Sequence, residues 1–452
     1  MSATQVVSLE NEKRKNKKEN PKENSEASPE SIYSALASAS EDVASTGGLL
    51  YRWTGIHWAA GDVEEEERIA FGWLRKNYGA RATPQLAKSC VAAAVLSARR
   101  LPKPTPERCV LPLRNGYLHF DSRPEASGEV ALCEADKAAG LTYEIATEFK
   151  ADAQSPRFDQ FIAEVLPDPE TRGWIQEYVG YSLLSDCRFQ KALFLLGSGA
   201  NGKSAFASII SHLHAQVVSM AVDRLEGFQL MPLTSASLVV VDETPTRIAE
   251  QALKKIISGG MILVDRKYRD PITIEPRAKW LVLGNQMPSI SDQTHGFWRR
   301  FVVVEFPRQF SEVEQDPHLA HKIVRDEMPG VLLWALHGLA RLTQRGHFPP
   351  PSQAMKDSAR KGLLESNSVA AWWADGRAEI NSSAATPRAD VYKDYHEWAR
   401  ENGMSAVGAE RFWPRLALVC GMKVEPKWQK IDGKPTRVVP VQLLAKKEEA
   451  PW

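Results

Sequence analysis

The sequence predicts an α/β fold with a parallel β-sheet at its centre. Residues 191–310 alternate short apolar runs with helical patterns, which is typical of strand–helix–strand units. The run Leu238–Val241 contains no polar residue, as expected of a strand buried on both faces of a parallel sheet. Hairpins and helices are predicted before this region, and helices with a final pair of strands after it.

Length and composition favour a globular protein of several folding units. A chain of 452 residues is expected to form roughly two to four such units. Hydrophobic residues make up 43% and charged residues 25% of the chain, which excludes a fibrous or wholly disordered protein. The formal net charge is only +1, so any contact with nucleic acid must come from local basic patches.

Cysteine spacing and hydropathy indicate a cytoplasmic protein. The five cysteines stand far apart without a CxxC pair, which argues against a zinc finger and against a disulfide framework. No apolar run approaches the roughly 20 residues that a membrane-spanning helix needs, and the polar N-terminus does not resemble a signal peptide. We therefore expect no membrane partner.

Composition divides the chain before residue 191 into two parts. Residues 1–46 are rich in Lys, Glu, Asn and Ser and predict a disordered tail, whose basic run at 13–18 is more often solvated than bound to phosphates. Residues 47–190 predict a folded domain. Its expected elements are a hairpin at 49–58, helices at 64–76 and 84–100, a hairpin at 110–120 with an Asn115–Gly116 turn, and two helices within 156–185.

A glycine-rich turn follows the first apolar run of the α/β region. The run Leu193–Leu196 leads into the turn, and an amphipathic helix that includes Phe206 and Ile210 follows it. This is the GxxxxGKS pattern in the strand–loop–helix setting that it requires. The residues of the turn are Gly197, Ser198, Gly199, Ala200, Asn201, Gly202, Lys203 and Ser204.

The chemistry of this pattern is nucleotide binding. Glycines let backbone N–H groups wrap the phosphates, and the N-terminus of the following helix favours an anion. Lys203 is expected to reach the β- and γ-phosphates of ATP, and Ser204 to hold Mg²⁺. The alternative, a chance match in a glycine-rich turn, leaves the flanking strand and helix without explanation.

Two carboxylates, Asp242 and Glu243, come directly after the apolar run Leu238–Val241. Because the carboxyl ends of parallel strands open onto one crevice, both acids are expected beside the γ-phosphate and the metal. We assign Asp242 to the Mg²⁺ shell and Glu243 to activation of the attacking water, and the order of these two roles stays open. Acids that merely cap a strand are the structural alternative.

A third apolar run, Lys279–Gly284, ends at Asn285, and a further run begins after Arg299 and Arg300. An asparagine at a strand end can orient the attacking water or sense the γ-phosphate. An arginine just before the next strand can reach across a subunit boundary and stabilise charge in the transition state. By themselves, Asn285 would more often be a turn residue and the two arginines a solvated pair.

The motifs GSGANGKS, LVVVDET, LKKIISGG, KWLVLGNQMP and WRRFVVVEF occur in this order. Together they resemble the superfamily 3 helicases of phages, plasmids and DNA viruses, most closely the helicase half of phage and plasmid primase–helicases and their poxvirus-type relatives. The resemblance implies that 191–310 is a P-loop ATPase core of the AAA+-like type. It also implies a helicase-associated N-terminal domain with a helical collar at 47–190 and a helical extension at 311–365.

The same resemblance implies a homo-oligomeric ring, expected to be a hexamer, with ATP bound between subunits. In that family the residue matching Arg300 is the arginine finger, with Arg299 as the fallback here, and Asn285 matches the sensor. The implied location is the cytoplasm of a bacterial host cell.

Residues 262–274 predict a hairpin whose tip carries Arg266, Lys267, Tyr268 and Arg269. The resemblance implies that this hairpin projects into the ring channel and grips single-stranded DNA. Its chemistry agrees, because cations contact phosphates without reading sequence and an aromatic ring stacks on any base. As an isolated observation, a basic hairpin tip is more often simply exposed.

Residues 366–445 predict a C-terminal winged helix. Helices at 388–401 and 409–420 are followed by a hairpin that bears Lys427, Lys430, Lys434 and Arg437. The tryptophans of this segment, Trp428 included, are expected in its core, because a small domain needs large apolar anchors. Contact with duplex DNA and contact with a protein remain equal alternatives for this domain.

The sequence thus predicts an ATP-dependent DNA helicase or translocase that replicates a phage, plasmid or integrated mobile element. No zinc-finger set or primase-type acid cluster precedes the helicase region, so priming is expected from a separate primase. The alternative is an ATP-driven, DNA-binding assembly switch or initiator scaffold that does not unwind. A small-molecule kinase is disfavoured, because the paired arginines and the basic hairpin have no substrate role there. The resemblance implies 3′-to-5′ polarity.

Overall fold

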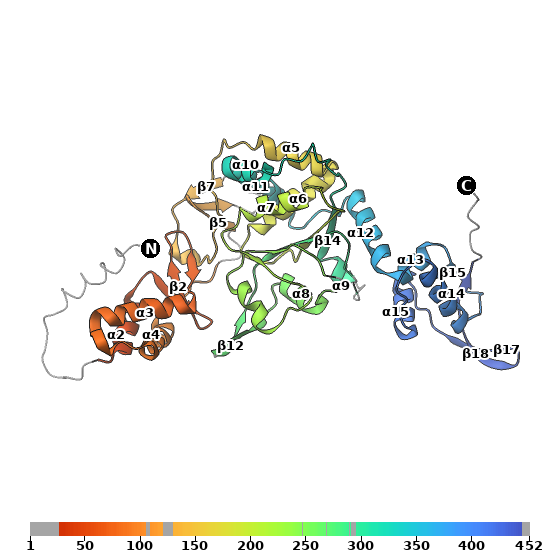
Figure 1. Ribbon diagram of the computed structural model, residues 1–452, viewed down its shortest axis with the longest axis horizontal. Helices are drawn as coiled ribbons and strands as arrows, with labels where there is room; N and C mark the ends of the chain where they lie inside the picture. The colour runs from red at the N-terminus through yellow and green to blue at the C-terminus, as the bar shows by residue number, and fades with distance from the viewer. Residues whose placement is uncertain are drawn as a thin grey trace.

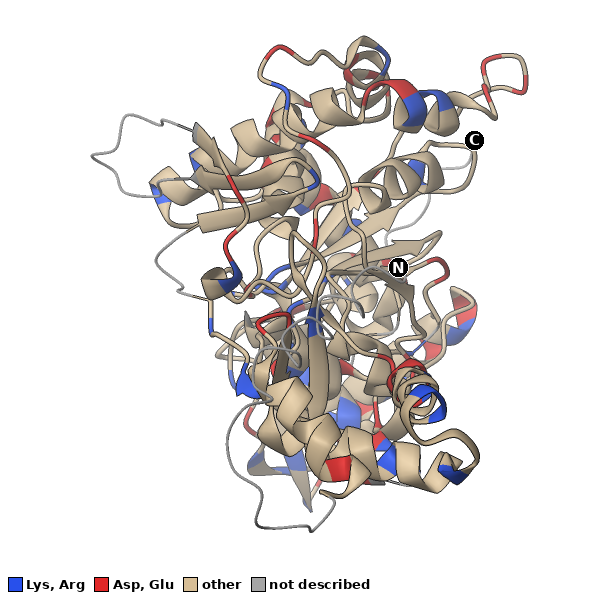
Figure 2. Ribbon diagram, turned by 90° about the vertical axis from the view of Figure 1, so that its left-hand side faces the viewer, with Lys and Arg blue, Asp and Glu red and all other residues tan. Residues whose placement is uncertain are grey.

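The structure is a computed structural model, and it has an N-terminal, a central and a C-terminal region (Figure 1). The described residues are 27–104, 109–120, 130–245, 247–267, 269–288, 290 and 295–444. The predicted α/β class with a parallel sheet is confirmed in the central region. Basic and acidic residues are interspersed in the view of Figure 2, as a net charge of +1 implies.

The central sheet has five parallel strands in the spatial order β14–β8–β13–β10–β9. Their bounds are β8 (Ala192–Leu196), β9 (Val217–Ser219), β10 (Leu238–Val241), β13 (Lys279–Gly284) and β14 (Phe301–Glu305). Because all strands run in the same direction, their carboxyl ends lie along one edge. Strand β13 lies between β8 and β10, so its end separates the glycine-rich turn from the two acids.

Both faces of this sheet are buried, which explains the continuous apolar runs. Successive side chains of a strand point to opposite faces. Leu193 and Leu195 therefore belong to one hydrophobic core, while Phe194 belongs to the other. The sheet is the middle layer between a helical face and a mixed face.

Helices from several parts of the chain pack on the helical face. They include α5 (Pro156–Val165), α6 (Pro169–Ser182), α7 (Lys203–Ser211), α10 (Leu319–Asp326) and α11 (Met328–Arg345). Helices α6 and α11 approach closely, since a Cβ added at Gly180 would lie 2.5 Å from the Ala335 carbonyl oxygen. Within the helical extension expected at 311–365, α10 and α11 are separate helices, with Pro329 in the first turn of α11.

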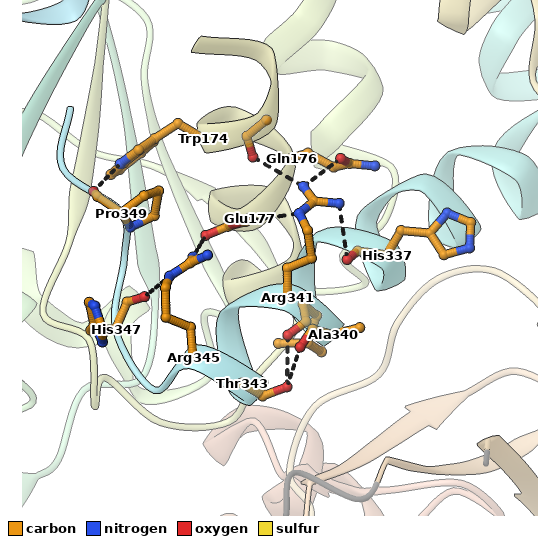
Figure 3. A network of polar contacts seen from close by, with 12 residues as sticks. Trp174, Gln176, Glu177, His337, Ala340, Arg341, Thr343, Arg345, His347 and Pro349 are labelled. Atoms are coloured by element: carbon orange, nitrogen blue, oxygen red, sulfur yellow. Dashed lines mark hydrogen bonds and ion pairs between the residues drawn. The ribbon is translucent and has the colours of Figure 1, made fainter. Parts of the chain in front are cut away.

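A buried carboxylate also joins α6 to α11 (Figure 3). The Glu177 side chain accepts hydrogen bonds from Arg345 and, at 3.4 Å, from Arg341. Arg341 also donates to the Gln176 side chain at 2.7 Å. Because Glu177 is buried and charged, it is stable only with such partners, so this network fixes the pairing of the two helices.

The mixed face is covered by short elements from two parts of the chain. Those from the central region are η3 (Gly227–Thr234), α8 (Glu250–Ile257), β11 (Ile262–Arg266), β12 (Arg269–Ile274) and α9 (His295–Trp298). The antiparallel β11–β12 hairpin confirms the predicted strands at 262–274. Val264 and Ile272 of this hairpin share a core with Leu49 and Tyr51 of the N-terminal region.

The N-terminal region contains three helices and a four-stranded sheet in the order β3–β2–β1–β4. The elements are α2 (Pro29–Ala39), β1 (Val43–Thr46), β2 (Leu49–Trp53), β3 (Trp58–Ala60), α3 (Val63–Tyr78), η1 (Gly79–Arg81), α4 (Pro84–Ser97) and β4 (Arg99–Arg100). The hairpin expected at 49–58 is confirmed as β2–β3. The helix expected at 84–100 ends earlier, because Arg99 and Arg100 pair with β1.

The predicted boundary of the disordered tail at residue 46 is wrong. Helix α2 is capped by the Ser28 side chain, and its Tyr33 and Ala37 are buried in a core with Cys90 and Ala94 of α4. The average composition of residues 1–46 hides this short apolar face. The basic run at 13–18 lies outside the described residues.

A second small sheet follows the N-terminal region. It contains β5 (Cys109–Leu113), β6 (Gly116–Phe120) and β7 (Val130–Cys133), followed by η2 (Lys137–Ala139). Strands β5 and β6 are joined by the predicted Asn115–Gly116 turn, where Gly116 adopts φ of +134°. The core of this sheet is continuous with that of α6 and α11, so the predicted limits at 190 and 310 do not separate hydrophobic cores.

The C-terminal region has its own core and is reached through α12 (Gln353–Ser366). Its elements are α13 (Ser368–Ala374), β15 (Ala378–Ile380), β16 (Thr386–Pro387), α14 (Arg388–Glu401), α15 (Ala409–Val419), β17 (Lys427–Ile431), β18 (Lys434–Val439) and β19 (Val441–Leu443). Trp372, Trp398 and Trp413 are buried as expected, but Trp428 is 67% exposed, so its assignment to the core is wrong. It lies on the β17–β18 hairpin, which has little core beneath it.

Among the helices of the described residues, none combines the length and the apolar character needed to cross a membrane.

Candidate functional site

The glycine-rich turn connects β8 to α7 along the carboxyl edge of the sheet. Gly202 adopts φ of +85°, and a Cβ there would lie 2.7 Å from the Val165 side chain of α5. This position therefore requires glycine for both its conformation and its space. Ala200 also adopts a positive φ of 48°, which is uncommon for a residue with a side chain.

The Lys203 side chain is held inside the turn. Its ammonium group donates to the Gly197 carbonyl oxygen at 2.6 Å and to the Asn201 side-chain oxygen at 2.9 Å. The residue is only 6% exposed, and burial lowers the pKa of Lys203 below its ordinary value. A neighbouring anion would compensate this desolvation, because opposite charge favours the protonated amine.

A cleft of about 800 Å³ brings most of the predicted site residues together. Its lining includes Gly199–Ser204 of the turn, Asp242 and Glu243 after β10, and Asn285 after β13. Asp242, Glu243, Asn285 and Ser204 are exposed to this cleft. The parallel strand order is what collects these residues, since they follow three strands whose carboxyl ends share one edge.

Hydrogen bonds position the segments that carry the acids. The Thr244 hydroxyl donates to the Leu283 carbonyl oxygen at 2.7 Å, which ties the end of β10 to the end of β13. The Ser219 hydroxyl donates to Asp242 at 3.5 Å. The carboxylates of Asp242 and Glu243 otherwise face the cleft, where they are available to a cation or to water.

The opposite wall of the cleft was not predicted from sequence. It is formed by α5 and the segment after β14, with Arg157, Phe161, Arg308 and Phe310 among its residues. Arg308 donates to Glu164 of α5 at 3.0 Å, and its guanidinium lies 4.4 Å from the centre of the Phe310 ring. A sequence signal existed for Arg308, because it follows β14 at the same edge as the turn.

Arg299 and Arg300 lie at the other edge of the sheet. They precede β14, and β14 runs parallel to β8 with Phe301 opposite Ala192. Five strand residues span roughly 16 Å, so neither arginine reaches the cleft of the same chain. Arg300 donates to the Ser258 hydroxyl at 2.8 Å and to the Gly296 carbonyl oxygen at 2.6 Å. Arg299 is exposed and makes no side-chain hydrogen bond with the described residues.

The β11–β12 hairpin carries the predicted DNA-contacting residues. Arg266 donates to the Asp270 carbonyl oxygen at 2.9 Å, and Lys267 is exposed at the tip. Tyr268 and the side chain of Arg269 lie outside the described residues. Ser258, which accepts the hydrogen bond from Arg300, lies in the short segment between α8 and this hairpin. This segment therefore connects the edge of the sheet that carries Arg299 and Arg300 to the hairpin.

The chemistry of the cleft suits an anion with an accompanying hard cation. Among the described residues, no group of three or more His, Cys, Asp or Glu side chains could hold a metal ion by itself. Mg²⁺ at phosphate sites is commonly held by only one or two protein oxygens, with phosphate and water completing its shell. The Ser204 hydroxyl and the Asp242 carboxylate are such donors.

Comparisons with known proteins found matches for part of this chain. Residues 195–300 match a family of unknown function (DUF5906). Over 188 residues the chain is 26% identical to a protein of Acanthamoeba polyphaga mimivirus named "Putative helicase L207/L206". The alignment covers 39% of this chain but only 19% of the viral protein. The chain is therefore related in sequence to a minor part of a protein that carries a helicase name.

Solved structures of the NrS-1 C-terminal region align with this chain at low sequence identity. One apo structure aligns with a TM-score of 0.48 and 12% identity over 92% of this chain and 100% of that chain. The A form apo structure aligns with a TM-score of 0.46 and 12% identity over 87% of this chain and 94% of that chain.

Proposed function

We propose that this chain is an ATP-dependent DNA helicase or translocase that acts as a ring in the replication of a phage, plasmid or integrated mobile element. The observation that carries the proposal is the meeting of Lys203, Asp242 and Asn285 in one cleft beside the glycine-rich turn. The sequence relation to a viral protein named as a helicase supports the same class.

ATP binds in the cleft with its phosphates on the turn. Backbone N–H groups of 199–204 and the start of α7 surround the phosphates, and Lys203 exchanges its bonds to the turn for the β- and γ-phosphates. The apolar part of the cleft, which includes Phe161 and Phe310, accommodates the base. The resulting charge pairing offsets the cost of burying the lysine.

Ser204 and Asp242 are the residues that would hold Mg²⁺, since both present oxygen atoms to the cleft beside the turn. When bound, Mg²⁺ neutralises charge on the phosphates. Glu243 accepts a proton from the attacking water, and the Asn285 amide orients that water or contacts the γ-phosphate. These assignments keep the roles of Asp242 and Glu243 as the sequence predicted them.

Arg299 and Arg300 act on the ATP bound by a second subunit. Because Arg299 and Arg300 lie at the edge opposite the cleft, they serve the cleft of a neighbour in a head-to-tail ring, expected to be a hexamer. Arg300 is the proposed finger. Its bonds to Ser258 and Gly296 must break or shift when it engages the neighbour's ATP.

The β11–β12 hairpin contacts single-stranded DNA in the ring channel. Arg266 and the exposed Lys267 supply cations for phosphates, and a contact of this kind is independent of sequence. Tyr268 and Arg269 belong to the same proposed contact.

The decisive experiment is ATP-dependent displacement of a labelled strand from forked duplexes of both polarities, with ATP hydrolysis measured with and without single-stranded DNA. Wild type is expected to unwind, with a 3′-to-5′ preference. Glu243→Gln is expected to bind ATP without hydrolysing it. Lys267→Ala should keep basal hydrolysis and lose its stimulation by DNA.

The outcomes separate the functional classes. Hydrolysis without strand displacement on either fork would replace the motor with an ATP-driven assembly switch or initiator scaffold. ATP hydrolysis at the same rate with and without DNA would contradict the proposal that DNA is the substrate. Priming activity abolished by Asp242→Ala would contradict the expectation of a separate primase.

A further inference from the structure

The β17–β18 hairpin extends beyond the helices of the C-terminal region (Figure 1). Residues 427–430 of β17 are exposed at every position, so neither face of this strand rests on a core. Strand β16 pairs with β18 only at Val438 and Val439, so the outer part of the hairpin is a two-stranded ribbon, which gains little from packing. Its side chains are therefore free to serve a partner.

One face of the hairpin combines an aromatic ring with cations. Trp428 pairs directly with Arg437 across the two strands, and Lys430 is two residues along on the same face. The Arg437 guanidinium lies 4.9 Å from the centre of the indole ring, and 67% of Trp428 remains exposed. Arginine thus covers part of the ring and leaves the rest to solvent.

The charge of the hairpin indicates the partner. Strands β17 and β18 carry Lys427, Lys430, Lys434 and Arg437, whereas the turn between them carries the single acid Asp432. A hollow beside the hairpin continues this surface, with Arg388 and Arg437 in its lining and Glu410 as its acid. Lysines are depleted at the centres of protein interfaces but are common on surfaces that contact phosphates.

We propose that the β17–β18 hairpin is a second binding site for single-stranded DNA, in which Trp428 stacks on an unpaired base and Lys430 and Arg437 contact the flanking phosphates. A base within a duplex is already stacked, and separating a step costs about a few kcal/mol. Unpaired bases accept an exposed aromatic ring without that cost. This site rests on the proposed function only in that DNA is the substrate of both, and it is separate from the channel hairpin.

The test measures binding of the full chain to a short labelled oligothymidine by fluorescence anisotropy, without nucleotide. Trp428→Ala is expected to weaken binding by roughly tenfold, and Trp428→Phe should retain most of the affinity. Lys430→Ala should lower the slope of log affinity against log salt by about 0.7. Lys393→Ala removes an exposed cation from α14 in the same region and should change nothing.

Each variant is compared with wild type by thermal unfolding, and the series is repeated in a Lys267→Ala background, which weakens the channel contact. Cross-linking of Trp428 to bromodeoxyuridine in the oligonucleotide supports the site directly. Equal binding by wild type and Trp428→Ala in both backgrounds would overturn it. An equal loss of affinity for blunt duplex would show phosphate contact without stacking and would also overturn it.

These outcomes are distinguishable from failure of the proposed function. ATP hydrolysis by Trp428→Ala in the absence of DNA is expected to equal that of wild type, because no residue of the hairpin lines the cleft. If wild type never unwinds a fork but Trp428→Ala still loses affinity, the hairpin site stands and the motor does not. If wild type unwinds but Trp428→Ala binds normally, only the hairpin site is lost.

Discussion

Polar residues at the two edges of the central sheet have opposite environments. At the carboxyl edge, Asp242, Glu243 and Asn285 face a cleft. At the amino edge, the buried Lys279 donates to the carbonyl oxygens of Leu184 and Arg277. One edge leaves hydrogen-bonding capacity for a ligand, whereas the other satisfies it within the protein.

His214 shows the same contrast at the amino edge. Its two ring nitrogens contact the hydroxyl groups of Ser182 and Ser237, each at 3.1 Å. Burial, together with the nearby Lys279, lowers the pKa of His214 to about 3. The polar groups of this edge therefore hold the fold together, except for Arg299, which is exposed, and Arg300, which is only half-buried.

The largest expected effect is a loss of ATP hydrolysis, and it tests whether Arg299 or Arg300 acts on another subunit. Arg300→Ala should lower ATP hydrolysis by about 10³-fold, as expected of an arginine finger. Arg299→Ala is the matched control, and a larger loss there would reassign the role to Arg299. Under the proposed action on a neighbouring subunit, mixing Arg300→Ala with Lys203→Ala subunits should restore part of the activity. No restoration in a mixture that assembles would place the action of Arg300 within its own subunit.

The next effect concerns the carboxyl edge. Lys203→Ala should lower hydrolysis by at least about 10²-fold, because the chain loses a preorganised cation at the phosphates. Its thermal stability should change little, because removal of a desolvated cation offsets the loss of its hydrogen bonds to Gly197 and Asn201. Titration with a fluorescent ATP analogue and thermal unfolding check both statements. A loss of stability with normal nucleotide binding would make Lys203 structural.

A cation at the amino edge should behave in the opposite way. Lys279→Ala should lower the free energy of unfolding by about 2 kcal/mol or more, because two buried carbonyl groups lose their donor and a cavity remains. Hydrolysis per folded molecule should stay near that of wild type. Chemical denaturation and activity at low temperature measure the two quantities, and a selective loss of activity would break the contrast between the edges.

The smallest effect is a pH dependence that arises from His214. Its folded pKa of about 3 lies below the ordinary 6.5, so between these values the unfolded chain binds a proton that the folded chain does not. Stability is therefore lost as the pH falls below 6.5, by up to about 2 kcal/mol at about pH 5. His214→Gln should make this slope shallower, whereas His212→Gln, at an exposed position, should not. Equal slopes in all three proteins would show that His214 titrates normally.

Much of the carboxyl edge followed from local sequence. The run Leu193–Leu196 with its glycine-rich turn predicted strand, loop and helix, because buried parallel strands are continuously apolar and the turn requires glycine. Asp242 and Asn285 were predicted beside the turn, since polar residues at the ends of parallel strands share an edge. The structure confirms that these residues line one cleft.

The opposite wall of the cleft could not be derived in this way. Arg157 and Arg308 are 151 positions apart in the chain and meet only because α5 packs over the segment after β14. The fold of residues 29–46 was missed for a related reason. The apolar face of α2 is short, and it becomes a stable helix by burying Tyr33 against α4.

By itself, the sequence determined the order of strands and helices in the central region, the glycine-rich turn and the residues that follow each strand. These are local properties, set by apolar periodicity and by backbone conformations that few residues adopt. Only the tertiary structure decided the spatial order of the strands, the different environments of polar residues at the two edges, and the exposure of Trp428. Those properties depend on which distant segments pack against a residue, and the residue type alone does not specify these segments.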